Sequence, residues 1–258
     1  MSKYKGYLID LDGTIYRGKD IIPAGKRFIE RLQDAKIPFV FVTNNTTRLP
    51  VEVMARLAEE YQIYVHENQI VTPTGALIDY LGEPTSIYVV GEPSLINPIV
   101  EAGFVIDTHS PEYVVVGLNR EITYGELSNA TLLIRNGGKF IGTNPDRNLP
   151  TEKGLEPGAG SFIELIKTTT DVEPVVIGKP NLAIMTAGVH RLCEISGLTL
   201  SFDDVAMVGD NYETDILAGV NNGIDQILAL GGFTTKEQLK DKETQPTYVV
   251  ESLDEFLL

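Results

Sequence analysis

Near the start of the chain an apolar run ends in two acids, a glycine and a hydroxyl: Tyr7-Leu8-Ile9-Asp10-Leu11-Asp12-Gly13-Thr14. The apolar residues are typical of a buried strand, which would deliver both carboxylates to the rim of a sheet. Two carboxylates two positions apart repel each other, and burying either one is costly, so the pair favours a bound cation or a proton on one of them. The same residues could instead form only a turn after an edge strand, with an aspartate capping the bend.

Helix and strand patterns alternate on both sides of a long central segment. Strands are expected at 7–9, 39–42, 175–177, 205–208, 226–230 and 247–250, and helices at 23–36, 50–61, 181–196 and 215–220. The order strand, helix, strand is the signature of a parallel sheet. The sequence therefore predicts an α/β protein with a Rossmann-like, doubly wound parallel-sheet core.

A second α/β pattern begins at about residue 83. Its expected strands are 87–91, 113–117 and 139–142, and its expected helices are 94–102 and 124–136. Segments rich in Gly and Pro, Gly82-Glu83-Pro84 and Val172-Glu173-Pro174, would join it to the core. We therefore expect a discontinuous core of residues 1–82 plus 174–258 and an inserted smaller domain of residues 83–173.

Composition excludes several classes of partner. The chain of 258 residues has 36 acidic and 21 basic residues, a net charge of −15, which argues against a nucleic-acid polymer or an anionic membrane. Its one cysteine, Cys193, cannot form an intrachain disulfide, which fits a reducing compartment. No apolar run is long enough for a membrane helix, and Met1 to Lys5 lead straight into a strand. We expect a cytoplasmic protein without a signal peptide.

Polar residues gather where the expected strands end. Ligands bind open parallel sheets beyond the carboxyl ends of the strands. The residues expected there are Asp10, Asp12, Thr43, Asn44, Lys179, Asp210 and Asp215. Carboxylates and a backbone carbonyl form a hard-oxygen site that suits Mg²⁺, while a lysine and a hydroxyl could hold phosphoryl oxygens. One aspartate could then attack phosphorus and the other could transfer the proton. Taken singly, the same residues could be a helix cap, a solvated lysine and a turn.

Four ordered segments resemble the motifs of the haloacid dehalogenase (HAD) superfamily. They are Asp10-Leu11-Asp12-Gly13-Thr14, Thr43-Asn44-Asn45, Gly178-Lys179-Pro180, and Gly209-Asp210 with Asp215. The resemblance spans nearly the whole chain and is greatest to the NagD-like, p-nitrophenyl phosphatase-like branch. Two segments of the inserted domain support that branch, Gly142-Thr143-Asn144-Pro145-Asp146 and Pro157-Gly158-Ala159-Gly160-Ser161.

The resemblance implies separate roles for the two aspartates of the first motif. Asp10 would be the nucleophile and Asp12 the general acid and base. Thr43 would bind the phosphoryl group, with Asn44 and Asn45 beside it as substrate-binding residues. Asp12 also argues against a dehalogenase, because dehalogenases lack this second acid.

The resemblance also implies a Mg²⁺ site. Asp210 would ligate the metal together with a carboxylate oxygen of Asp10 and the backbone carbonyl of Asp12. Asp215 would contact the metal directly or through water, and Lys179 would neutralise charge on the nucleophile and the transition state.

The spacing of the motifs identifies the inserted domain as a cap. About 30 residues separate Asp12 from Thr43, whereas more than 130 separate Thr43 from Lys179, the C2 position of the family. Such a cap would close over the crevice and select the substrate. Residues expected after cap strands could either contact the substrate or solvate a loop: Asn119, Thr143, Asn144, Asp146, Arg147 and Asn148. Because a second subunit can contact caps in this branch, a homodimer is a further expectation.

These expectations together predict a Mg²⁺-dependent phosphatase that hydrolyses small phosphate monoesters through an aspartyl-phosphate intermediate. Nucleoside monophosphates and sugar phosphates are both candidate substrates, and the sequence does not choose between them. The alternatives are a phosphotransferase or mutase with the same intermediate, and a phosphate-binding regulatory protein without activity. A receiver-type phosphoacceptor domain is disfavoured, because no aspartate ends the strand at Val42.

Overall fold

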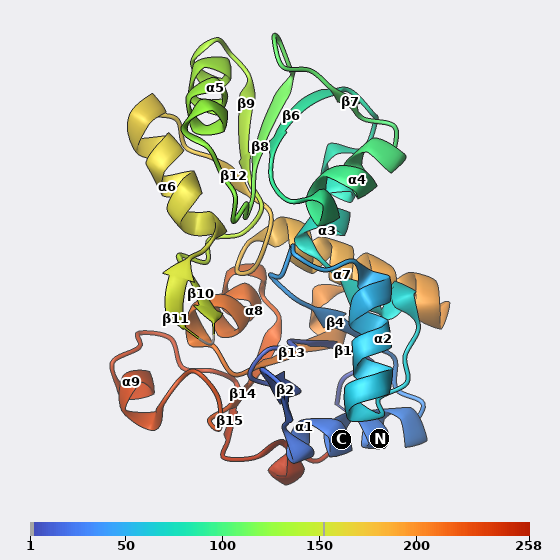
Figure 1. Ribbon diagram of the computed structural model, residues 1–258. Helices are drawn as coiled ribbons and strands as arrows, with labels where there is room; N and C mark the ends of the chain where they lie inside the picture. Colours follow the sequence, from blue (N-terminus) through green and yellow to red (C-terminus); the bar gives the residue numbers. More distant parts are fainter. Residues whose placement is uncertain (1–2, 152) are drawn as a thin grey trace. The chain divides into compact units, whose positions relative to one another are not determined.

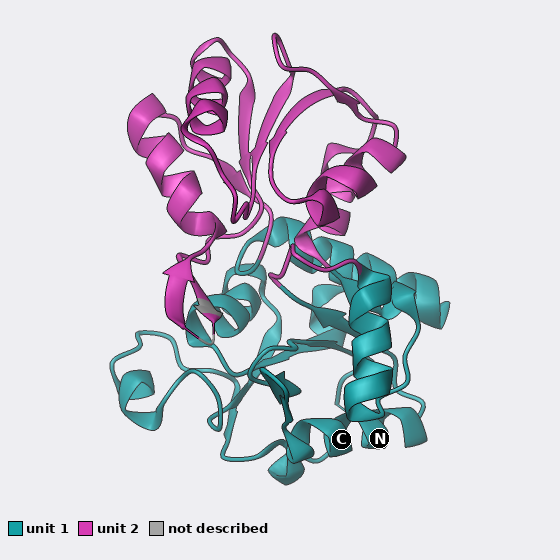
Figure 2. Ribbon diagram, viewed as in Figure 1, with its two compact units in different colours: residues 1–43, 50–71, 179–258 teal, residues 44–49, 72–178 magenta. Residues whose placement is uncertain are grey.

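The computed structural model describes residues 3–151 and 153–258, which form two compact units (Figures 1 and 2). Unit 1 comprises residues 1–43, 50–71 and 179–258, and unit 2 comprises residues 44–49 and 72–178. The chain therefore passes from unit 1 into unit 2 and back twice, first at residues 44–49 and then at residues 72–178. The functional division into a core and a cap at residues 83–173 stays a prediction.

Unit 1 is built on a six-stranded sheet in the order β15-β14-β13-β1-β4-β5, in which every neighbouring pair is parallel. Its strands are β1 (Gly6–Ile9), β4 (Phe39–Val42), β5 (Ile70–Val71), β13 (Val205–Gly209), β14 (Asp225–Ala229) and β15 (Tyr248–Val250). A small antiparallel hairpin joins β2 (Tyr16–Arg17) to β3 (Asp20–Ile21). The α-helices are α1 (Pro23–Asp34), α2 (Pro50–Tyr61), α7 (Leu182–Ser196), α8 (Leu217–Asn222) and α9 (Lys236–Lys240). Shorter helical turns are η1 (Glu67–Gln69), η2 (Phe202–Asp204), η3 (Tyr212–Ile216) and η4 (Leu253–Glu255).

Both faces of this sheet are buried, which explains why its central strands are apolar throughout. On one face Tyr7 and Ile9 join a core cluster with Phe28 of α1 and Leu57 of α2. On the other face Leu8 lies against α7, where a Cβ on Gly188 would be 3.0 Å from a Leu8 methyl carbon. Since alternate residues of a strand point to opposite faces, β1 anchors both helix layers. This packing fixes the position of the residue that follows β1.

Unit 2 has its own parallel sheet, in the order β12-β9-β8-β6-β7. Its strands are β6 (Ser86–Val90), β7 (Val105–Ile106), β8 (Tyr113–Val116), β9 (Lys139–Gly142) and β12 (Val175–Val176), with an antiparallel hairpin of β10 (Asn148–Thr151) and β11 (Gly154–Pro157). Its helices are α3 (Pro73–Leu81), α4 (Pro93–Glu101), α5 (Tyr124–Arg135) and α6 (Ala159–Thr170). A separate hydrophobic core joins α5 and α6 to this sheet.

The predicted α/β class and parallel-sheet core are confirmed, but one strand belongs to a different sheet from the one we expected. The strand predicted at 175–177 forms as β12, yet it pairs in parallel with β9 of unit 2. The backbone N–H of Ile177 continues this pairing by donating to Gly142 O at 3.0 Å. Lys179 follows β12 in the sequence and is the first residue of the last segment of unit 1. The sequence pattern also missed the strands β5 and β7, the helices α3, α6 and α9, and the two hairpins, β2 with β3 and β10 with β11.

Within residues 3–151 and 153–258, no helix combines the length and the apolar character that crossing a membrane requires.

Candidate active site

Three adjacent strands of unit 1 end in buried polar residues. Asp10 follows β1, Thr43 follows β4 and Asp210 follows β13, with exposed fractions of 7, 3 and 2%. The backbone N–H of Asp10 still donates to Val208 O at 2.9 Å, so the carboxylate leaves the sheet from a fixed backbone. Because the strands are parallel neighbours, all three side chains lie at the same edge of the sheet. This edge was predicted to be the reaction site.

A buried lysine joins two of the carboxylates. Lys179, 1% exposed, donates from Nζ to Asp10 Oδ1 at 2.6 Å and to Asp215 Oδ1 at 2.7 Å. Burial alone would lower the pKa of the Lys179 ammonium, but the charges of Asp10 and Asp215 outweigh it and hold the pKa above its usual value. The lysine is therefore a fixed positive charge beside the Asp10 carboxylate.

Asp210 is held by groups from two other loops. Its Oδ2 accepts the Phe233 N–H at 2.6 Å, and its backbone oxygen accepts the Thr234 N–H at 2.9 Å. Thr14, 2% exposed, lies between Asp210 and Asp10: its hydroxyl is 3.2 Å from Asp10 Oδ2 and 3.4 Å from Asp210 Oδ1. Thr14 thus connects the ends of two strands, at Asp10 and Asp210, that are far apart in the sequence.

Asp215 lies on a π-helical turn, η3, that leads into α8. Its Oδ2 accepts the Asn211 N–H at 3.1 Å, so the carboxylate is bonded to the start of its own turn. π-turns are rare and often occur at functional sites. Here the turn directs a 1% exposed carboxylate toward Lys179.

Glycine is required where the backbone comes close to Asp210. Gly13 has φ of +100°, a conformation that side chains rarely adopt, and a Cβ there would collide with the Asp210 carboxylate. A Cβ on Gly232 would collide with the same carboxylate. The glycine of the first motif therefore lets the loop after β1 close around Asp210.

The carboxylates have the chemistry of a metal site. Asp10, Asp210 and Asp215 each offer an oxygen within 4.8 Å of the others, and all three residues are buried. Burial raises the pKa of Asp10 well above its usual value, and Asp215 and Asp210 add to the rise while Lys179 opposes it. Burial and Asp215 raise the pKa of Asp210 to about 6. One lysine does not offset three carboxylates, so a hard divalent cation fits this cluster.

Asp12 is not a member of this buried cluster. Its residue is exposed, it follows Leu11 on the loop after β1, and it forms an isolated bridge with Tyr16. An exposed carboxylate near a buried one is the arrangement in which two acids can take different roles. The predicted role of its backbone carbonyl as a metal ligand stays a prediction.

The predicted substrate-binding residues lie in unit 2, and three of them bond to one another. Asn44 Nδ2 donates to Asp146 Oδ1 at 3.2 Å, Asn144 Nδ2 donates to Asn44 O at 2.9 Å, and the Asp146 N–H donates to Asn144 Oδ1 at 3.1 Å. Asn45 accepts from the Thr47 N–H and hydroxyl at 2.7 and 2.8 Å, so its side-chain oxygen closes a turn. Thr143 is fully buried, and within the described residues its hydroxyl has no hydrogen-bond partner. Their contact with substrate stays a prediction.

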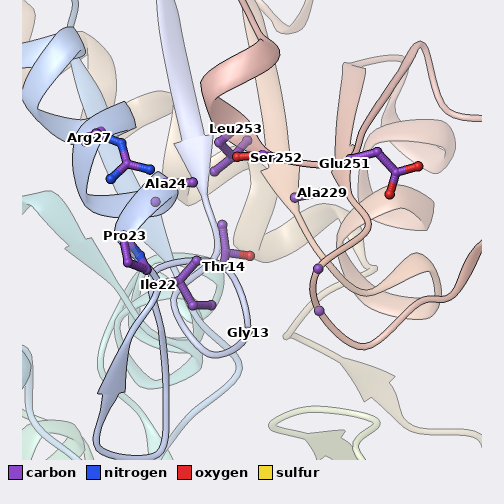
Figure 3. Close-up of a pocket in the computed structure, with 13 residues that line it drawn as sticks. Gly13, Thr14, Ile22, Pro23, Ala24, Arg27, Ala229, Glu251, Ser252 and Leu253 are labelled. Atoms are coloured by element: carbon purple, nitrogen blue, oxygen red, sulfur yellow. The ribbon is translucent and has the colours of Figure 1, made fainter.

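Figure 3 shows a cavity of about 250 Å³ in unit 1. Its lining residues are Gly13, Thr14, Ile22, Pro23, Ala24, Gly25, Arg27, Ala229, Gly231, Gly232, Glu251, Ser252 and Leu253. Thr14, whose hydroxyl bonds to Asp10 and Asp210, is one of these lining residues. Thr14 lies near the middle of the view, with Arg27 and Glu251 on opposite sides of it. The cavity therefore borders two of the loops that enclose Asp210.

Sequence reasoning assigned no role to Thr14 or Thr234. Thr14 belongs to the first motif, and its hydroxyl is the feature from which a role at the site could have been predicted. Thr234 is 3% exposed and its Oγ1 accepts the Tyr212 N–H at 2.7 Å, so it supports the turn that carries Asp215. No local pattern distinguishes it from an ordinary loop threonine.

Two family models match the chain. A model described as haloacid dehalogenase-like hydrolase matches residues 7–105, and one described as HAD-hydrolase-like matches residues 176–256. An acid sugar phosphatase from Staphylococcus aureus strain USA300 is 44% identical over 262 residues, which cover 100% of this chain and 98% of that protein. The chain belongs to the haloacid dehalogenase-like hydrolases.

Other relatives agree with this family. An acid sugar phosphatase from Staphylococcus saprophyticus is 42% identical over 261 residues, covering 100% of this haloacid dehalogenase-like hydrolase and 98% of the relative. Among solved structures, a double mutant of a thermostable NPPase from Geobacillus stearothermophilus matches with a TM-score of 0.91, 42% identity and coverage of 100 and 99%. A 4-nitrophenylphosphatase from Thermotoga maritima matches with a TM-score of 0.89, 33% identity and coverage of 98 and 96%. The predicted NagD-like, p-nitrophenyl phosphatase-like branch is confirmed, and the protein is a phosphatase of this family.

Proposed function

We propose that the protein is a Mg²⁺-dependent phosphatase that hydrolyses small phosphate monoesters, sugar phosphates among them, through an aspartyl-phosphate intermediate. The observation that carries the proposal is the buried Lys179, bonded to both Asp10 and Asp215 beside Asp210. A carboxylate with a fixed cation and a metal-binding cluster next to it is equipped to attack a phosphate ester.

The residues that would hold Mg²⁺ are Asp10, Asp210, the backbone carbonyl of Asp12 and Asp215, which contacts it directly or through water. When bound, Mg²⁺ would supply positive charge that offsets the negative charge of the phosphoryl oxygens and of the carboxylates. Oxygen ligands alone suit this ion. The raised pKa of Asp210, about 6, indicates that the metal-free cluster carries more negative charge than its surroundings stabilise.

The first half of the reaction uses the two aspartates of the first motif. An Asp10 oxygen forms a bond to phosphorus while the bond from phosphorus to the leaving oxygen breaks, and the electron pair leaves with that oxygen. Asp12, protonated at this stage, gives its proton to the leaving alkoxide. The products are the free alcohol and an aspartyl-phosphate on Asp10.

The second half returns the enzyme to its starting state. Asp12, now a carboxylate, takes a proton from water as the water oxygen bonds to phosphorus. The bond between phosphorus and Asp10 breaks, inorganic phosphate leaves and the Asp10 carboxylate is restored. Lys179 offsets negative charge in both halves, because it lies 2.6 Å from an Asp10 oxygen. Thr43, buried at the end of β4, would donate its hydroxyl to a phosphoryl oxygen.

The substrate class is proposed from the relatives and from the predicted cap. The acid sugar phosphatases of the two staphylococci align with the whole of this chain, including residues 83–173. Because those residues would select the leaving group, relatives with the same insertion support sugar phosphates over nucleoside monophosphates. Asn44, Asn144 and Asp146 are the candidate selecting residues.

The test is steady-state hydrolysis by the purified protein of p-nitrophenyl phosphate, sugar phosphates and nucleoside monophosphates. We expect turnover with Mg²⁺, loss of turnover with EDTA and recovery on adding excess Mg²⁺. A rate that EDTA does not change would refute the metal-dependent mechanism. Including free sugars as acceptors separates hydrolysis from phosphotransfer, because a transferase would form a new sugar phosphate instead of inorganic phosphate.

A further inference from the structure

The loop that carries Asp12 continues directly into the hairpin of β2 and β3. The Gly13 N–H donates to Tyr16 O at 2.7 Å, and Asp12 forms a bridge with Tyr16. Tyr16 then pairs with Ile21 across the hairpin. The position of the peptide between Asp12 and Gly13 therefore depends on the position of Tyr16.

Two side chains of α2 hold the tip of this hairpin. The Tyr61 hydroxyl donates to the carbonyl oxygen of Gly18 at 3.0 Å, and the Arg56 guanidinium donates to the same oxygen. Arg56 also donates to the Tyr61 hydroxyl at 2.7 Å. Gly18 has φ of +59°, so its carbonyl is presented by a tight turn. Both donors thus converge on a single acceptor.

The same two residues also pack against the ring of Tyr16. The Tyr16 and Tyr61 rings are stacked, with centroids 5.0 Å apart and an interplanar angle of 17°. The Arg56 guanidinium carbon lies 4.5 Å from the Tyr16 ring centroid. Arg56 is mostly buried, with a side-chain exposure of 14%, so its attraction to the ring is screened little by water. We call Arg56 and Tyr61 the hairpin clamp.

A second contact fixes the hairpin on its other side. Arg17 of β2 donates to Gly231 O at 2.9 Å, in the loop that also contributes Gly232 beside Asp210. The hairpin is therefore bonded both to α2 and to a loop of the carboxylate cluster. In Figure 1, β2 is drawn in dark blue and α2 in a lighter blue.

We propose that the hairpin clamp is a positioning device for Asp12, which sets the geometry of proton transfer to the leaving group. This inference rests on the proposed function, in which Asp12 is the general acid. Asp12 is exposed and is followed by a loop, so its strand alone does not fix it as β1 fixes Asp10. Arg56 and Tyr61 act through Tyr16, and neither is a catalytic residue.

The proposal predicts a dependence on the leaving group that a merely structural role would not produce. A p-nitrophenolate leaves readily without a proton, whereas a sugar alkoxide needs one. General acid catalysis contributes about 10²- to 10⁴-fold, and a displaced acid loses part of that factor. We expect Arg56→Ala to lower kcat/KM by about 10-fold or more for a sugar phosphate and by less than about 3-fold for p-nitrophenyl phosphate.

The experiment measures kcat/KM with Mg²⁺ for both substrates in wild type, Arg56→Ala, Tyr61→Phe, Asp12→Asn and the control Arg191→Ala. Arg191 is a helix arginine of α7 that pairs with Glu194 at 3.2 Å, and its removal should change neither rate. Tyr61→Phe removes only the hydroxyl that donates to Gly18 O and keeps the stacked ring. Tyr61→Phe should also lower kcat/KM more for the sugar phosphate than for p-nitrophenyl phosphate, but by a smaller factor than Arg56→Ala. This second variant keeps the test decisive if Arg56→Ala folds poorly.

The outcomes separate the clamp from the proposed mechanism. The inference is supported if kcat/KM falls more for the sugar phosphate than for p-nitrophenyl phosphate in the clamp variants and in Asp12→Asn. We call this pattern a selective loss. Selective loss in Asp12→Asn alone, with equal losses or none in both clamp variants, overturns the clamp and leaves the mechanism intact. Equal losses on both substrates in Asp12→Asn overturn the acid role of Asp12, and the inference with it.

Discussion

Replacing Lys179 with methionine tests the electrostatics of the site. The substitution keeps an unbranched side chain of similar length and removes the ammonium that lies 2.6 and 2.7 Å from carboxylates of Asp10 and Asp215. The three residues are 1, 7 and 1% exposed, so water cannot replace the lost charge. Breaking a buried ion pair by removing one partner costs about 3–5 kcal/mol. We therefore expect the metal-free variant to be less stable than the metal-free wild type by about this amount.

The loss of stability caused by Lys179→Met should depend on pH. The pKa of Asp210 is raised to about 6, and that of Asp10 is raised well above its usual value. A raised folded-state pKa means that the folded protein binds more protons than the unfolded chain, so stability falls as pH rises through the window from about 4 to about 6. Without Lys179 both pKa values should rise further. The difference in stability between wild type and Lys179→Met should consequently be larger at pH 7.5 than at pH 5.

The assay is thermal unfolding in EDTA at both pH values. A free-energy loss of about 3–5 kcal/mol lowers Tm by about 10 °C in a protein of this size. Lys167→Met is the matched control, because Lys167 is paired at 2.9 Å with the exposed Glu173, and surface pairs contribute little. Equal melting temperatures for wild type and Lys179→Met at pH 7.5 would refute the assignment of Lys179 as the neutralising charge of this cluster.

Three further predictions follow from the same geometry. Asp10→Asn should abolish turnover yet raise the metal-free Tm at pH 7.5, because burial penalises the Asp10 carboxylate; a lower Tm would contradict the raised pKa. Mg²⁺ should raise Tm more at pH 7.5 than at pH 5, since protonated Asp210, with a pKa of about 6, binds the ion poorly; an equal rise at both pH values would exclude Asp210 as a ligand. Thr234→Val leaves the buried Tyr212 N–H without its acceptor and should cost about 1–3 kcal/mol in a thermal melt, whereas Thr234→Ser keeps the acceptor and should cost little.

Much of unit 1 could be predicted because its strands are local patterns. Tyr7 to Ile9 and Phe39 to Val42 are continuous apolar runs, which suit strands buried on both faces, and both form strands of the central sheet. A polar residue directly after such a run falls at the carboxyl end of a parallel strand. Asp10 and Thr43 could therefore be assigned to one edge before their distance was known.

Other elements could not be predicted, because their patterns do not specify a partner. Val175 and Val176 fit either parallel sheet, and their pairing with Ile141 and Gly142 depends on the approach of β9. Strand β5 has only two residues, too few for a period to be visible. The clamp of Arg56 on Gly18 joins residues 38 positions apart, and nothing at either position signals the other.

The sequence by itself determined the α/β class, the order of the motifs and the identity of the reactive groups, because apolar periodicity and residue chemistry are local properties. Only the tertiary structure decided which of those groups meet. Lys179 and Asp10 are 169 positions apart, and their 2.6 Å contact forms because two distant segments of the chain fold together in unit 1. It likewise decided that Thr14 bridges two carboxylates and that Asp12 remains exposed. Such contacts depend on the packing of whole elements against both faces of a sheet, which no short stretch of residues contains.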